Sequence, residues 1–239
     1  ASLPSLGLLT LAGLTPPEHQ CEYIEIEDIR KLAALPDGFD LVCISSFSAQ
    51  MAEGYELADR YQALGVPVVL GGLHVTALPG EAAQHCSAVV VGEGESVWPE
   101  VLRDAGKGRL QREYRATGPF DQTRAPMPAF HLLDIGKYNR LTVQASRGCP
   151  FHCEFCASSI LLTSRYKQKP IERVLAEIDR IRELWHHPFL EFADDNAFVD
   201  KRYWKELLSR LAGRHIHWFA ETDLSVHEDE ELLTRLRDA

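Results

Sequence analysis

Three cysteines lie within eight residues of one another, in a spacing typical of metal chemistry. They are Cys149, Cys153 and Cys156, a C-x3-C-x2-C arrangement. The loop follows residues 141–146, a predicted strand, and loops at the carboxyl ends of strands carry the active site in β/α barrels. Three thiolates on one short loop can hold three corners of a cubane iron-sulfur cluster, which normally takes four cysteines. The spacing therefore predicts a cluster with one iron open to another ligand.

Zinc is the alternative metal for this loop, with His152 as the fourth ligand beside the three cysteines. Zinc sites usually bring their ligands as two separated pairs. In this loop the neighbours His152 and Cys153 would have to point the same way from consecutive positions. We therefore favour the iron-sulfur cluster, and a zinc knuckle and inert buried thiols are the alternatives.

The elements that must position this loop alternate between strand and helix. After the strand at 141–146, the hydrophobic pattern predicts strands at 189–193 and 216–222 and helices at 171–185, 203–211 and 229–237. Three β/α units over residues 141–239 are typical of the first half of a (β/α) TIM barrel. Three units cannot close a barrel, so we expect the natural chain to continue beyond Ala239.

Residues 1–105 are predicted to form a separate α/β domain of flavodoxin-like or Rossmann-like type. Short β-branched runs predict strands at 22–26, 41–44, 66–70 and 88–91, and the last three are almost continuously apolar, as in a parallel sheet covered on both faces. Helical spacing predicts helices at 6–14, 50–64, 81–85 and 97–105. A flavodoxin-like sheet has a strand before its first helix. Because none precedes residues 6–14 and the chain starts at Ala1, we expect a cut at the N-terminus.

Glycine and proline interrupt residues 106–140, which we interpret as a linker or strap between the two domains. Within this segment only residues 110–116 have the pattern of a strand.

Polar and glycine-rich turns follow two of the strands predicted in the first domain. Such turns at the carboxyl ends of parallel strands bind nucleotides or large cofactors, because glycine lets a ligand approach the backbone. The candidate residues in these turns are Ser45, Phe47, Gly71, Gly72 and His74.

The cysteine loop, with the aromatic Phe155 before its last cysteine, resembles the CxxxCxΦC motif of radical S-adenosylmethionine (SAM) enzymes. The resemblance implies a [4Fe-4S] cluster on Cys149, Cys153 and Cys156, with SAM chelating the fourth iron. It also implies reductive cleavage of SAM to methionine and a 5′-deoxyadenosyl radical, with the electron coming from an external donor of flavodoxin or ferredoxin type.

The second barrel strand ends in Asp194, Asp195 and Asn196, where radical SAM enzymes often have Gly-Gly-Glu to hold the SAM ammonium. This chain departs from that pattern, although carboxylate and amide oxygens could accept from an ammonium equally well. The alternative is that an aspartate here caps the next helix or turn. Glu221, at the end of the third strand, is a weaker candidate for the SAM site, and a solvated carboxylate is its alternative.

The stretch Gly71-Gly72-Leu73-His74, followed by Gly92-Glu93, resembles the N-terminal domain of cobalamin-binding radical SAM proteins. The positions of Ser45-x-Phe47 and Gly71-Gly72 are similar to the S-x-L and G-G that line the cobalamin tail slot. The D-x-H-x-x-G loop, whose histidine ligates cobalt in many cobalamin proteins, is absent from this sequence. His74 is near the same edge, although a hydrogen-bonded loop histidine is its more ordinary role.

This resemblance, over residues 3–239, implies cobalamin-dependent methylation of an unactivated carbon on a small-molecule substrate. The alternatives are a radical SAM enzyme whose first domain is only a scaffold, and a zinc-knuckle binding module.

The amino-acid composition limits which classes of partner and which cellular compartment are expected. The formal charge is −10, from 25 Lys and Arg against 35 Asp and Glu, which argues against a nucleic-acid partner because phosphate binding needs clustered cations. No apolar run reaches the roughly 18 residues that span a bilayer, and no secretory signal is recognisable. We therefore expect a cytoplasmic protein. Cys21, Cys43 and Cys86 are interpreted as small buried apolar residues.

Overall fold

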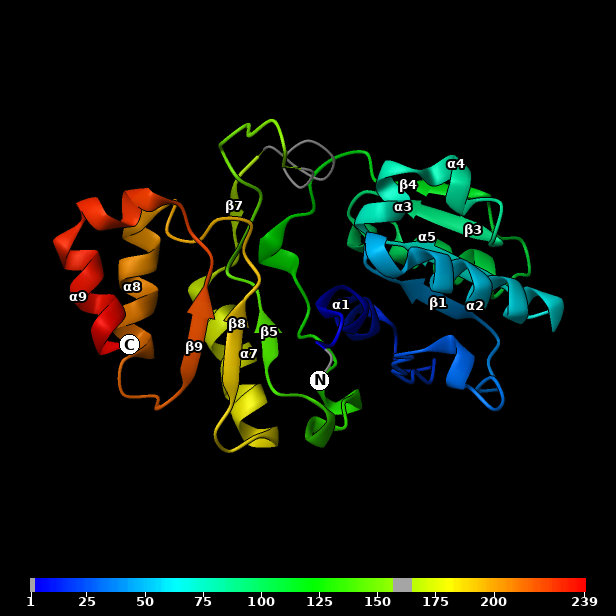
Figure 1. Cartoon of the computed structure of the whole chain (residues 1–239), viewed down its shortest axis with the longest axis horizontal. Helices are drawn as coiled ribbons and strands as arrows, with labels where there is room; N and C mark the ends of the chain where they lie inside the picture. Colours follow the sequence, from blue (N-terminus) through cyan, green and yellow to red (C-terminus); the bar gives the residue numbers. More distant parts are fainter. Residues whose placement is uncertain (1–2, 157–164) are drawn as a thin grey trace. The chain divides into compact units, whose positions relative to one another are not determined.

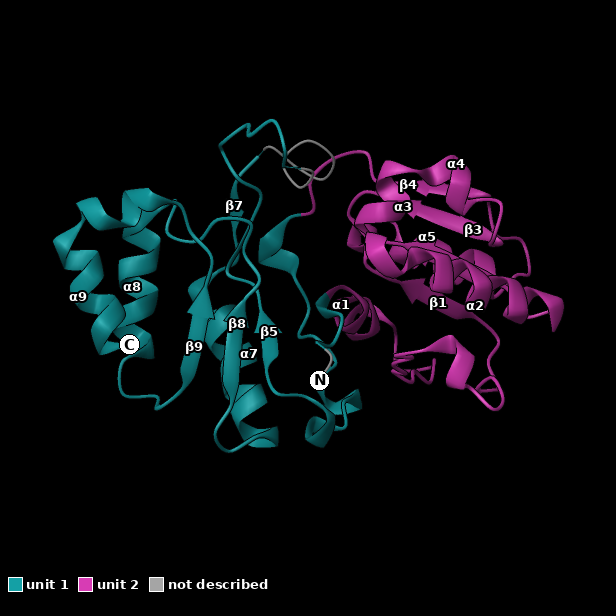
Figure 2. Cartoon of the chain, viewed as in Figure 1, with its two compact units in different colours: residues 1–6, 121–239 teal, residues 7–120 magenta. Residues whose placement is uncertain are grey.

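A computed structural model describes residues 3–156 and 165–239 of the chain (Figure 1). The chain forms two compact units, coloured separately in Figure 2. Unit 1 comprises residues 1–6 and 121–239, and unit 2 comprises residues 7–120. The domain boundaries predicted at residues 105 and 141 stay predictions, and the division between the units lies inside the segment interpreted as a linker.

Unit 2 is built on a four-stranded parallel sheet in the order β1-β2-β3-β4. The strands are β1 (Val42–Ser45), β2 (Val68–Gly71), β3 (Ala88–Val91) and β4 (Glu113–Arg115). The first three lie within a residue or two of the predicted strands, which confirms the parallel α/β class of this part of the chain. Strand β4 comes from residues 110–116, so part of the predicted linker completes the edge of this sheet.

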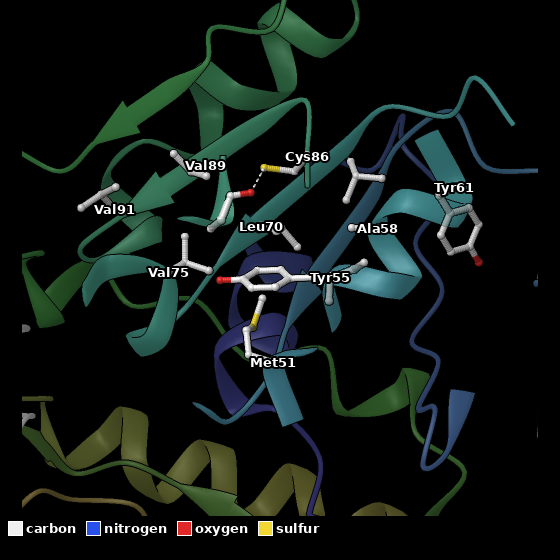
Figure 3. Packing of buried hydrophobic residues seen from close by; sticks show 12 residues of the cluster. Met51, Tyr55, Ala58, Tyr61, Leu70, Val75, Cys86, Val89 and Val91 are labelled. Carbon is white, nitrogen blue, oxygen red and sulfur yellow. Dashed lines mark hydrogen bonds between the residues drawn. The ribbon is translucent and has the colours of Figure 1, made fainter. Parts of the chain in front are cut away.

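Helices cover both faces of this sheet because its strands are apolar on both sides. Side chains alternate along the strands, so that Leu70 and Val89 face α2 (Met51–Ala63), α3 (Leu73–Ala77) and α4 (Pro79–Ala82). Figure 3 shows Met51, Tyr55 and Val75 from these helices around Leu70. Val69 and Val90 belong to the opposite cluster, with residues of α1 (Leu6–Leu14) and α5 (Trp98–Ala105).

The strand predicted at residues 22–26 is wrong: these residues have irregular backbone structure. A strand needs a neighbouring backbone to receive its hydrogen bonds, and the described sheet begins at β1, which pairs only with β2. The alternation of residues 22–26 has the period of a strand but no pairing partner. The helix predicted at 81–85 is shifted, because α4 begins at Pro79 and ends at Ala82.

Unit 1 contains three β/α units, as predicted for the first half of a barrel. Its parallel sheet has the order β5-β8-β9, with β5 (Leu141–Val143), β8 (Phe189–Phe192) and β9 (His217–Ala220). Helix α7 (Ile171–Leu184) precedes β8, α8 (Lys201–Leu211) precedes β9, and α9 (Glu230–Asp238) follows it. Asp200 and Asp229 begin α8 and α9 by accepting hydrogen bonds from Tyr203 N and Leu232 N.

Two short strands bring together the two ends of the cysteine-bearing segment. Strand β6 (Ser146–Arg147) pairs antiparallel with β7 (Lys167–Gln168), with Ser146 opposite Gln168. The two ends of the segment are therefore held together in a two-stranded sheet of their own, which begins shortly after β5.

Seven 3-10 turns complete the described secondary structure: Ile29–Lys31, Ser48–Gln50, Gly94–Ser96, Gln122–Arg124, Phe130–Leu132, Ile135–Lys137 and Leu224–Glu228. Among the helices within 3–156 and 165–239, none has both the length and the apolar character needed to cross a bilayer.

Candidate functional site

The three cysteines of the predicted cluster site follow β6 at the carboxyl end of β5. Cys149 and Cys156 are half-buried and Cys153 is exposed, while Cys156 N donates to Cys153 O at 3.0 Å and closes a turn between two of the thiols. Within the described residues, no three His, Cys, Asp or Glu side chains converge as a metal ion requires. The donor set nevertheless fits an iron-sulfur cluster, since its three soft thiols lie on one short loop.

Asp194, the first acidic residue after β8, binds the start of the cysteine loop. Its Oδ2 accepts from Ala145 N at 3.1 Å, and its Oδ1 accepts from both the N–H and the hydroxyl of Ser146. The side chain is buried. Burial raises the pKa of Asp194 to about 6, although the hydrogen bonds from Ser146 and Ala145 oppose the shift. Both carboxylate oxygens therefore serve to hold the backbone where it leaves β5.

Asp195, the residue after Asp194, also binds the backbone at the start of the cysteine loop, in this case at Gly148. Gly148 N donates to Asp195 Oδ2 at 2.7 Å. Gly148 has φ +86°, a left-handed conformation that favours glycine. The turn that leads into Cys149 is thus fixed by a carboxylate from β8, while the side chain of Asp195 is exposed.

Asn196 is the third consecutive residue after β8 to contact the loop. Its Nδ2 donates to Cys149 Sγ at 3.7 Å and to Asp223 Oδ2 at 2.7 Å, and its Oδ1 accepts from Asp223 N at 3.1 Å. Asn196 is 5% exposed. Asp223 follows β9, so this contact joins the carboxyl ends of all three strands.

The other predicted SAM residues lie apart from this network. The Phe155 ring is 91% exposed. Glu221 is exposed, and its backbone oxygen accepts from Ala197 N at 2.9 Å. The SAM roles of Phe155, Glu221 and the three residues after β8 stay predictions.

A second polar cluster lies behind the start of the loop. Tyr203 OH donates to Lys169 O at 2.7 Å and lies 3.4 Å from Ala145 O, which also accepts from Lys169 N at 2.8 Å. The Lys169 ammonium pairs with buried Glu177 at 2.6 Å. Burial raises the pKa of Glu177 and of Tyr203. The network ties α7 and α8 to the strand end that carries the cysteines.

The second candidate site is at the carboxyl edge of the sheet in unit 2. Ser45 and Gly71 end β1 and β2 and lie opposite each other in the register. Gly72 has φ +101°, and a Cβ there would lie 2.7 Å from Ser45 Oγ. Alanine at 72 would therefore collide with Ser45, so this close approach of the two strand ends requires glycine. The cobalamin roles of Ser45, Gly71 and Gly72 stay predictions.

Apolar side chains border this edge, since Phe47 is 70% exposed and Leu73 and Leu78 are also exposed. Exposed apolar groups around a glycine-lined edge are typical of a ligand surface.

The remaining cobalamin candidates have defined local partners. Gly92, at φ +86°, donates its N–H to Thr76 Oγ1 at 3.0 Å. Glu93 is buried and accepts from Phe120 N. His74 Nε2 lies 3.4 Å from Glu81 Oε1, which agrees with a hydrogen-bonded loop histidine.

Cys43 and Cys86 of unit 2 pack with apolar core residues, whereas Cys21 is half-buried and its interpretation stays a prediction. Burial raises the pKa of Cys43 to about 12 and also raises that of Cys86, whose Sγ donates to Ala82 O at 3.2 Å. Both thiols are protonated at neutral pH, which is unfavourable for a metal ligand.

Asp223, Ser146 and Thr76 use their side chains to contact candidate site residues and were not predicted from the sequence. Asp223 stands two residues after Glu221 at the end of a predicted strand, a position that could have marked it. Ser146 and Thr76 carry no such signal.

Comparison with known proteins identifies relatives of this chain. Residues 3–102 match the family model described as the B12 binding domain. The chain is 28% identical, over 98% of its length, to bacteriochlorophyllide d C-8(2)-methyltransferase of Chlorobaculum tepidum. It is 31% identical, over 82% of its length, to the C-12(1)-methyltransferase of the same organism. The alignments cover 54% and 44% of these relatives, so the chain spans about half of their length.

The fold is also similar to that of solved structures. The solved structure of the cobalamin-dependent SAM radical enzyme OxsB with aqua-cobalamin bound matches 83% of this chain and 33% of its own, with TM-score 0.65 and 19% identity. This chain belongs to the radical SAM proteins that carry a B12-binding domain. The B12 binding domain match covers most of unit 2, and the sheet of unit 1 is consistent with a partial radical SAM fold.

Proposed function

We propose that this radical SAM protein cleaves SAM reductively and methylates an unactivated carbon of a small molecule in a cobalamin-dependent reaction. The observation that carries the proposal is the anchored C-x3-C-x2-C loop at the carboxyl ends of β5, β8 and β9, in the same chain as a B12-binding domain. The methyltransferase names of the curated relatives support the reaction class.

Cys149, Cys153 and Cys156 would hold a [4Fe-4S] cluster with one iron free for SAM. The residues at the carboxyl edge of the sheet in unit 2, namely Ser45, Phe47, Gly71, Gly72, Gly92 and Glu93, would line the cobalamin site. When bound, the cluster supplies the electron that cleaves SAM, and cobalamin supplies the methyl group. An external donor of flavodoxin or ferredoxin type would reduce the cluster.

The contacts separate two roles among the acidic residues. Asp194 directs both oxygens at Ala145 and Ser146, so we assign it to anchoring the cysteine loop. Asp195 and Glu221 are exposed at the same strand ends, and a carboxylate there can accept hydrogen bonds from the ammonium of SAM. Asp195 is favoured because it also fixes Gly148, next to the first cysteine.

The test is SAM cleavage by protein purified and reconstituted without oxygen. We expect about four irons per chain, and methionine and 5′-deoxyadenosine on addition of SAM and a strong reductant. Cys156→Ala should lose iron and activity, whereas Cys21→Ala, outside the loop, is the matched control and should keep both. A single zinc per chain, or a full cluster that cleaves no SAM, would refute the proposal.

Cobalamin dependence needs a separate arm of the experiment. Bound corrinoid absorbs visible light at bands distinct from those of the cluster, so binding can be followed directly. If SAM is cleaved and no corrinoid binds, the B12-binding domain is only a scaffold and the methylation part of the proposal is wrong.

A further inference from the structure

The contact between Asn196 and Cys149 has a chemical consequence for the cluster site. Asn196 Nδ2 lies 3.7 Å from Cys149 Sγ, within the longer reach of a hydrogen bond to sulfur. The asparagine is 5% exposed, so water does not compete freely for its amide. A buried amide at this distance is positioned as a donor to the first cysteine of the loop.

The orientation of the amide follows from its other two partners. Asp223 N can only donate, and it lies 3.1 Å from Asn196 Oδ1. The Asp223 carboxylate can only accept when ionised, and its Oδ2 lies 2.7 Å from Asn196 Nδ2. A flipped amide would place NH2 against N–H and oxygen against a carboxylate. One Nδ2 hydrogen is therefore used by Asp223, and the other is available to Cys149 Sγ.

Asp223 is itself held firmly. Its Oδ1 accepts from Ser225 N at 2.7 Å at the start of a 3-10 turn. Hydrogen bonds from Ser225 and Asn196 hold the pKa of Asp223 below its usual value, which keeps the carboxylate ionised. Thr222 Oγ1 donates to Ala197 O at 2.8 Å, so the ends of β8 and β9 are also joined beside the amide.

We propose that Asn196 is a positioning residue that donates a hydrogen bond to the Cys149 thiolate and raises the reduction potential of the cluster. This inference rests on the proposed function, because it assumes that Cys149 is a cluster ligand. Negative charge on a cluster and its thiolates grows on reduction, so a donor at the sulfur stabilises the reduced form. Asp223 contributes to the same effect, because its hydrogen bonds orient the Asn196 amide.

The first test needs no substitution near the cluster. The chain contains two asparagines, Asn139 and Asn196, so asparagine that carries 15N in its side-chain amide alone labels only these two Nδ2 atoms. Asn139 is exposed, and N139Q leaves Asn196 as the only labelled one. We expect pulsed electron paramagnetic resonance of the reduced cluster, without SAM, to detect 15N coupling in both wild-type and N139Q protein. A fully loaded cluster without this coupling would overturn the inference.

The second test measures the reduction potential of the cluster. In Asn196→Leu, which keeps the branched shape of the side chain and removes the donor, we expect the ratio of reduced to oxidised cluster at a fixed potential to fall up to tenfold, or about 59 mV for one electron. Asp223→Asn should shift the ratio in the same direction by less. Asp121→Asn is the matched control, because Asp121 also caps a 3-10 turn, through Thr123 N. It should leave the ratio unchanged.

The outcomes distinguish this inference from the proposed function. Protein that binds no iron-sulfur cluster refutes the proposed function, and the inference with it. A loaded wild-type cluster that cleaves SAM but shows no 15N coupling refutes only the role of Asn196. An unchanged potential in loaded Asn196→Leu protein does the same. If Asn196→Leu protein does not incorporate the cluster, the 15N coupling in wild-type and N139Q protein decides whether Asn196 donates to Cys149.

Discussion

The burial of Asp194 gives a pH dependence that can be measured in the cluster-free protein. The folded protein raises the pKa of this carboxyl from 3.8 to about 6, a difference worth about 3 kcal/mol of unfolding free energy. Because the folded state holds the proton more tightly, the protonated carboxyl contributes its full stability below pH 3.8. That contribution is lost as the pH rises through about 6, so the effect falls between about pH 4 and pH 6.

Asp194→Asn removes the titration but keeps the shape of the side chain. We expect the unfolding free energy of this variant, relative to wild type, to rise by about 3 kcal/mol between pH 4 and pH 7. The absolute difference at a single pH also contains the cost of turning an amide toward the N–H groups of Ala145 and Ser146, about 1–3 kcal/mol for each donor left unsatisfied. The change with pH isolates the buried charge from that cost.

Urea unfolding between pH 4 and pH 7, followed by tryptophan fluorescence, measures this difference. Three of the four tryptophans, Trp185, Trp204 and Trp218, belong to unit 1, so the signal reports mainly the unit that contains Asp194. Asp121→Asn is the control, because hydrogen bonds from Thr123 lower the pKa of Asp121, so this carboxyl titrates below the pH range of the experiment. A free-energy difference between Asp194→Asn and wild type that stays constant within about 1 kcal/mol would refute the reasoning.

Two further predictions follow from close contacts. Gly72→Ala should abolish the absorbance change on cobalamin addition, because its Cβ would lie 2.7 Å from Ser45 Oγ and its φ is +101°; Gly80→Ala, with open space around the new Cβ, should bind as wild type. Equal binding of cobalamin by both variants would contradict a role for the Ser45–Gly72 contact in the cobalamin site. Lys169→Met should destabilise the protein by about 3–5 kcal/mol in urea unfolding, because it leaves Glu177 buried without its partner. Lys169→Met with Glu177→Leu should recover most of that loss, and a double variant as unstable as the single one would contradict this account.

The elements that the sequence predicted well are those with a strong local pattern. Helix 6–14 coincides with α1 and strand 88–91 with β3, because continuous apolar character over the length of an element marks it without reference to neighbours. Residues 22–26 have an equally clear alternation and form no strand. Alternation describes the side chains, whereas a strand also needs a paired backbone, which no local pattern reports.

For the candidate site, the amino-acid sequence by itself determined the chemistry: three thiols on one loop, and polar or glycine-rich turns at the carboxyl ends of predicted strands. Only the tertiary structure decided what Asp194, Asp195 and Asn196 contact. Their partners, from Ala145 to Cys149, lie 47 to 49 residues away in the chain, and Asp223 lies 27 residues beyond Asn196. Hydrogen bonds at such separations depend on the parallel register of β5, β8 and β9, because that register brings the ends of the three strands to one edge.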